Sequence, residues 1–125
     1  MIIGALLSMA TASVTYVLGQ RDKIGTVKAS ASVTLVLCLF IFLLSHFIEF
    51  DWGKLFAHTY AGSFVGMTAK ERLPMIAIVL AGLLASIVFS MLAGPLKGVG
   101  GTLGFSAFLS VSILYFLNNI LVKLR

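Results

Sequence analysis

The sequence has 125 residues, of which 60% are apolar and only 10% are charged, and it carries a net charge of +5. Soluble domains are typically about 45–50% apolar and about 25% charged. This composition therefore excludes a soluble enzyme, a disordered tail and a nucleic-acid-binding domain. We expect an integral membrane protein that forms one transmembrane domain over residues 1–125.

Five apolar runs without a charged residue in their interior follow one another along the chain. A helix that crosses a bilayer needs about 20 residues, or slightly fewer when flanking residues help. Four runs meet this length, whereas the third would reach only about 22 Å as a helix. We predict an all-α integral membrane protein with four long transmembrane helices and one short membrane segment, either crossing or re-entrant. The predicted spans are residues 2–18, 29–48, 55–69 (the short segment), 73–93 and 101–122.

The positions of the lysines and arginines test whether the short segment crosses the bilayer. If it does not cross, five of these residues share one side and four the other. If it crosses, seven share one side, and only Lys54 and Lys97 face the other. Cytoplasmic loops carry an excess of Lys and Arg, so charge favours crossing, with the N-terminus outside and the C-terminus inside. Length favours a re-entrant segment, and both alternatives stay open.

The short segment is the first candidate for a functional site. Its two glycines form a GxxxG pair, which lets two helix backbones approach closely. A short segment rich in Gly, Ser and Thr is also what a half-helix ion site needs, because its terminal backbone groups can coordinate an ion. The alternatives are helix packing and an ion or solute path lined by His58, Thr59, Gly62, Ser63 and Gly66.

A glycine-rich stretch before the last span is the second candidate. Glycine permits a positive φ angle and exposes backbone amides. The stretch predicts either a loop followed by a helix, with Thr102 as its cap, or an anion-binding nest at the membrane surface. Its candidate residues are Gly100, Gly101, Thr102 and Gly104.

Small residues recur at four-residue intervals in three of the long spans. Such a row lies along one helix face and predicts contacts between helices; a hydroxyl-lined pore is the alternative. A chain this small has few internal partners for so many small faces, so we expect a homo-oligomer or partner membrane subunits. The rows contain Gly4 and Ser8, then Gly82, Ser86, Ser90 and Gly94, then Ser106 and Ser110.

Catalytic and metal-binding patterns are missing from the sequence. His46, Glu49, Asp51 and His58 match no zinc-site spacing, so we expect them to sit at the membrane interface. No nucleophilic side chain has a nearby base in the sequence. Apart from Glu49 next to the end of the second span, no acidic residue lies in or directly beside a long span, although proton pumps usually need a buried ionisable residue there. We therefore expect no enzyme activity, no metal and no cofactor.

These features favour a channel or transport subunit for a small ion or solute, acting as an oligomer in the lipid bilayer. The alternatives are a non-catalytic structural or anchoring subunit of a larger membrane complex and a membrane-depolarising effector. We expect a multi-pass protein of the bacterial inner (plasma) membrane without a nucleic-acid partner. Nothing in the sequence names the transported species.

Overall fold

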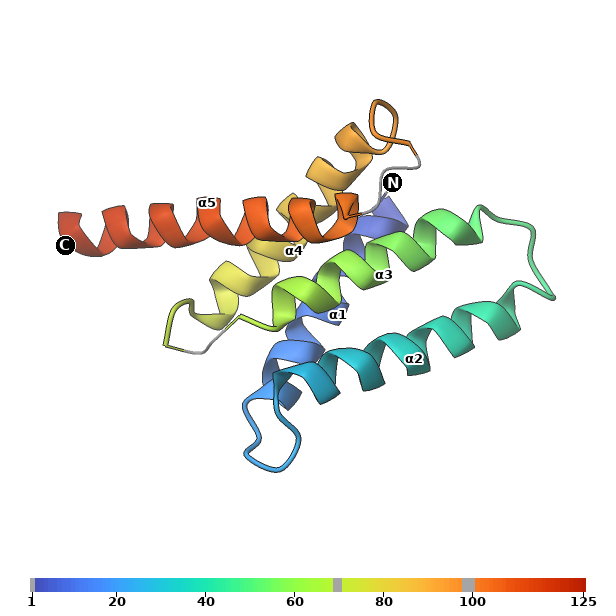
Figure 1. Ribbon diagram of the computed structural model, residues 1–125, viewed down its shortest axis with the longest axis horizontal. Coiled ribbons are helices and arrows are strands. Elements are labelled where there is room, and N and C mark those ends of the chain that lie inside the picture. The colour runs from blue at the N-terminus through green and yellow to red at the C-terminus, as the bar shows by residue number, and fades with distance from the viewer. Residues whose placement is uncertain (1, 69–70, 98–100) are drawn as a thin grey trace.

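The computed structural model describes residues 2–68, 71–97 and 101–125. The regular structure of these residues consists of five α-helices (Figure 1): α1 (Ile2–Gly19), α2 (Thr26–Leu44), α3 (Trp52–Gly66), α4 (Met75–Leu92) and α5 (Thr102–Leu124). By length and composition, α1, α2, α4 and α5 can each span a membrane. The prediction of an all-helical chain with four helices of membrane-spanning length is therefore confirmed.

Several helix ends differ from the ends of the apolar runs, and α2 ends at Leu44, four residues before the predicted end of its span. Trp52 starts α3, three residues before the uncharged run, because Asp51 caps it: its carboxylate accepts a hydrogen bond of 3.4 Å from the backbone N–H of Lys54. Lys28 lies inside the first turn of α2. The prediction that Thr102 caps the last helix is wrong, because Gly101, in the left-handed conformation with a φ of 90°, takes that position.

Helices α1 and α3 run parallel and touch along their small residues. The matched pairs are Gly4 with His58, Ser8 with Gly62, and Ala12 with Gly66, and each pair is 54 residues apart in the sequence. A methyl group on Gly62 would lie 2.8 Å from Cα of Ser8 and would also strike its carbonyl oxygen. The two backbones therefore approach as closely as a GxxxG pair permits.

Helix α4 packs against α1 in the opposite direction. The hydroxyl of Ser8 donates a 2.8 Å hydrogen bond to the carbonyl oxygen of Gly82, and the hydroxyl of Tyr16 donates one of the same length to the carbonyl oxygen of Leu73. The start of α1, the start of α3 and the end of α4 consequently lie together, and we call this the N-terminal end of the bundle. Between the helices lies a core of mostly small side chains: Ala12, Tyr16, Val65, Leu73, Ala77, Ile78, Ala81, Ala85 and Ala107.

Helices α2 and α5 lie at the periphery of the bundle. Helix α2 contacts α1 and α3, whereas α5 contacts α3 and α4. The first half of α5 is anchored by the buried residues Ser106, Ala107 and Ser110. Its C-terminal half extends beyond the other helices (Figure 1), and large apolar side chains such as Phe116 and Leu121 are exposed there.

Candidate functional site

A cavity of about 890 Å³ with both apolar and polar lining residues opens at the N-terminal end of the bundle. The first turn of α1, the start of α3 and the last turns of α4 surround it. We call this cavity the vestibule. Its polar and charged lining residues are Asp51, Lys54, His58, Ser90 and Lys97.

His58 lies deepest among these polar side chains and is 5% exposed. Its Nδ1 forms a 3.0 Å hydrogen bond with the hydroxyl of Ser86 on α4, and its ring meets Phe89 edge to face. Gly4 makes room for the ring, because a methyl group on Gly4 would lie 2.5 Å from Cδ2 of His58. Among the residues that the structure describes, the other ring nitrogen, Nε2, has no hydrogen-bond partner. One side of the imidazole is thus fixed, and the other is available to a ligand.

The mouth of the vestibule carries more positive than negative charge. Lys54 and Asp51 form an exposed ion pair of 3.1 Å, and hydrogen bonds from the side chain and the backbone of Lys54 lower the pKa of the Asp51 carboxylate. Lys97 has no ion-pair partner within residues 2–68, 71–97 and 101–125. The N-termini of α1 and α3 add partial positive charge, and the C-terminus of α4 adds partial negative charge. The balance favours a negatively charged or polar solute.

Only one of the five path residues predicted in the short segment lines the vestibule, and that residue is His58. Gly62 and Gly66 lie in the contact with α1. The hydroxyls of Thr59 and Ser63 donate hydrogen bonds to carbonyl oxygens of α3 itself. The structure therefore places most of this segment in helix packing.

The glycine-rich candidates lie apart from the vestibule. Gly101 has open space around it, and Thr102 is the first residue of α5. Gly104 lines a separate hollow of about 320 Å³ between α3 and α5, together with Phe64 and Thr68. Gly100 lies outside the described residues.

The predicted packing residues lie mostly inside this one chain. Gly4, Ser8 and Gly82 contact neighbouring helices, and Ser86 bonds His58. Ser106 and Ser110 are fully buried, and each donates a hydrogen bond to a carbonyl oxygen of α5. Ser90 is partly exposed and donates to the carbonyl oxygen of Ser86, whereas nothing lies within 4 Å of a methyl group placed on Gly94.

The structure does not gather the polar residues around the end of α2 into a metal site. His46 is exposed, and its Nδ1 lies 3.1 Å from the carbonyl oxygen of Phe42. Across the described ranges, no three His, Cys, Asp or Glu side chains lie close enough together to hold a metal ion.

The sequence does not identify Lys54 and Lys97 in the lining of the vestibule, or Ser86 beside it, as site residues. Ser86 was assigned to packing, and no local pattern pairs it with His58, which is 28 residues away. Lys54 and Lys97 carried a usable signal, because the charge count already separates them from the other seven cations. Two cations isolated at one end of a bundle are a reason to look for a site there.

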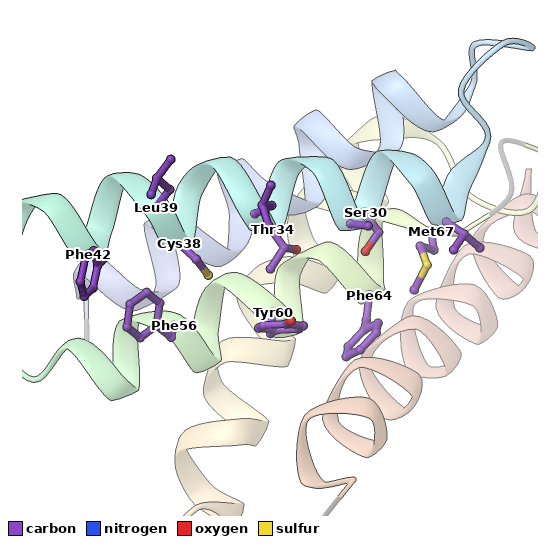
Figure 2. Close-up of a pocket in the computed structure, with 12 residues that line it drawn as sticks. Ser30, Thr34, Cys38, Leu39, Phe42, Phe56, Tyr60, Phe64 and Met67 are labelled. Atoms are coloured by element: carbon purple, nitrogen blue, oxygen red, sulfur yellow. The ribbon is translucent and has the colours of Figure 1, made fainter.

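A second cavity, of about 830 Å³, lies between α2 and α3. Figure 2 shows its two sides: a row of small residues on α2 faces a row of aromatic residues on α3. We call it the α2–α3 groove. The small row is Ser30, Thr34 and Cys38, and the aromatic row is Phe56, Tyr60 and Phe64.

We compared the chain with models of protein families, with curated proteins and with solved structures, and none of them matches it. The candidate function therefore rests on the chemistry of the site itself.

Proposed function

We propose that the protein is a transport subunit for a small ion or solute, and that the vestibule is the entrance for this solute. The observation that carries the proposal is a cavity, lined by apolar side chains together with Asp51, Lys54 and Lys97, that leads to the nearly buried His58. Ionisable residues at membrane depth are costly and usually mark a functional site. The volume of the vestibule falls within the range of known ligand sites.

The charges of the vestibule support an anion as the preferred solute. Lys54 and Lys97 outnumber Asp51, and two helix N-termini approach the same cavity. When its Nε2 carries a proton, His58 can donate a hydrogen bond to an anion that has lost part of its hydration shell.

We further propose that α3 crosses the membrane. Helix α3 runs beside α1 from the same end of the bundle, and the pair Ala12–Gly66 extends the contact past the middle of α1. Crossing places seven Lys and Arg residues at the end opposite the vestibule. By the positive-inside rule the vestibule then opens to the outside of the cell.

Passage beyond His58 requires a movement of α3 relative to α1. The contact of Gly62 with the backbone of Ser8 leaves no space between α1 and α3 one helical turn beyond His58. A transport cycle therefore includes a state in which this contact opens, as in the rocking motions of membrane transporters.

An anchoring subunit of a larger complex is the second candidate function. The exposed apolar surface on the C-terminal half of α5 favours it, because partner helices can pack against such a surface. In this case the vestibule plays no part in flux.

Ion flux into proteoliposomes that contain the purified protein tests the proposal. We expect anion flux that falls at least several-fold in Lys97→Glu and in His58→Gln. Lys123→Glu changes charge at the C-terminal end of α5 and serves as the matched control, which should keep its flux. Flux of cations alone would refute the anion preference, and no flux of any ion from a folded sample would favour the anchoring subunit.

A further inference from the structure

Thr34 places a buried hydroxyl without a hydrogen-bond partner in the middle of α2. The residue is 5% exposed, and its Oγ1 has no partner among the described residues. Helical hydroxyls elsewhere in this chain bond a carbonyl oxygen of the preceding turn, as Thr11 bonds that of Leu7 and Thr59 that of Leu55. An unpaired hydroxyl in an apolar region is unfavourable, so it requires a specific explanation.

Thr34 lies beside a space that is large enough for a ligand. Its side chain points from α2 toward α3 at the wall of the α2–α3 groove, and Tyr60 lies across from it (Figure 2). Thr15 also has a buried unpaired hydroxyl, but it lies against Gly66 in the α1–α3 contact and lines neither the groove nor the vestibule. Of these two residues, only Thr34 lines the groove.

The groove lining indicates an uncharged, apolar occupant. None of the lining residues is Asp, Glu, Lys, Arg or His, and most are aliphatic or aromatic. Because α2 and α3 contact each other, a partner helix could cover the groove only from outside. A slender molecule can lie along it between the small row and the aromatic row.

The depth of Thr34 excludes the acyl chain of an ordinary phospholipid as its hydrogen-bond partner. Thr34 lies near the centre of the 19-residue helix α2, about 12 Å from its first residue and about 15 Å from its last. The hydrocarbon core of a bilayer is about 30 Å thick, and phospholipids keep their polar groups at its surfaces. The hydrogen-bonding group must therefore belong to a molecule that carries it within its apolar body.

We propose that the α2–α3 groove binds an uncharged lipophilic molecule whose carbonyl oxygen accepts a hydrogen bond from Thr34. In the structure the hydroxyl itself is buried, so binding includes a rotation of Thr34 about χ1 to another staggered conformer that turns the hydroxyl into the groove. The aromatic row of α3 supplies a broad apolar wall for the body of the ligand. This site is separate from the vestibule and does not depend on the proposed transport function.

Cys38 provides a reporter for this site. It is the single cysteine of the chain and lines the groove four residues after Thr34. The experiment measures the rate of Cys38 alkylation by N-ethylmaleimide in the purified full-length protein in detergent. The probes are a long-chain ketone with a mid-chain carbonyl and the alkane of the same length.

We expect the ketone to halve the alkylation rate at a concentration about 2- to 10-fold lower than the alkane requires. Thr34→Val removes the hydroxyl with little change in volume and should abolish the difference between the two probes. Thr15→Val removes the other unpaired hydroxyl and should leave the difference intact. Helical content measured by circular dichroism establishes that both variants are folded.

Four results would overturn the proposal. They are equal protection by ketone and alkane in the unsubstituted protein, no protection by either probe, loss of the ketone preference in Thr15→Val, and its persistence in Thr34→Val. Slower alkylation at higher protein concentration without any probe would show instead that a second copy covers the groove, which also contradicts the proposal.

Discussion

The hydroxyl of Ser8 donates a 2.8 Å hydrogen bond to the carbonyl oxygen of Gly82 and thereby ties α1 to α4. On α3, Gly62 meets the backbone of the same serine. Three helices therefore meet at one small residue. Membrane helices associate through close packing and interhelical hydrogen bonds, and this position combines the two.

Removal of the Ser8 hydroxyl is expected to destabilise the bundle. Ser8→Ala leaves the α1–α4 contact without its hydrogen bond, and we expect a loss of about 0.6–2 kcal/mol. Ser13→Ala is the control, because Ser13 donates only to the carbonyl oxygen of Met9 in its own helix. Unfolding in mixed micelles of increasing denaturing-detergent content measures both variants. Equal losses would contradict a special role for Ser8.

A methyl group at Gly62 is expected to separate α1 from α3. Gly62→Ala should cost about 1–3 kcal/mol by overpacking, because its Cβ would lie 2.8 Å from Cα of Ser8. Gly104→Ala meets nothing within 4 Å and should stabilise α5 by about 0.5–1 kcal/mol through helix propensity. The same unfolding assay compares them, and a neutral Gly62→Ala would argue against the close α1–α3 contact.

Gly4 is expected to control the position of His58. Gly4→Ala brings a methyl group to 2.5 Å from the imidazole, so the ring must move and its bond to Ser86 should break. Side-chain ¹⁵N nuclear magnetic resonance of His58 reports this change directly. Gly94→Ala, at the open end of α4, should leave the His58 signals unchanged. Unaltered signals in Gly4→Ala would contradict the described packing.

The cap of α3 is expected to weaken in acid. Because Asp51 has a lowered pKa in the folded protein, its stabilisation is fully present above the unfolded-state pKa and is lost as the pH falls through the folded-state value. The protection factor of the amides in the first turn of α3, which is the intrinsic exchange rate divided by the observed rate, should fall over this acidic range. In Asp51→Asn the cap persists without a titratable group, so this fall in the protection factor should disappear. A pH response that survives in Asp51→Asn must have another source.

The number of helices could be predicted from the sequence, but the start of α3 could not be read from hydropathy alone. The apolar run begins at Leu55, whereas capping by Asp51 extends the helix to Trp52. Hydropathy measures transfer into lipid, while a helix end is decided by which group satisfies its first N–H donors. An N-cap residue such as Asp51 indicates where the helix starts, whereas the charge-free run does not.

Local sequence patterns could not show which side chains of the candidate site contact one another. Four-residue spacing identified Ser86 as a helix-face residue, yet the meeting of Ser86 and His58 depends on how α3 and α4 pack. Thr34 was also not singled out, because the sequence does not reveal whether a helical hydroxyl bonds its own backbone or stays unpaired. Both facts are properties of packing.

The constant 54-residue offset between α1 and α3 has a consequence for biogenesis. The small face of α1 emerges from the ribosome long before its partner on α3 exists. At about 5–20 residues per second, the delay is about 3–11 s. During this interval α1 is free to pair with helices of other nascent chains. Slower translation between α1 and α3 should therefore lower the yield of correctly assembled protein.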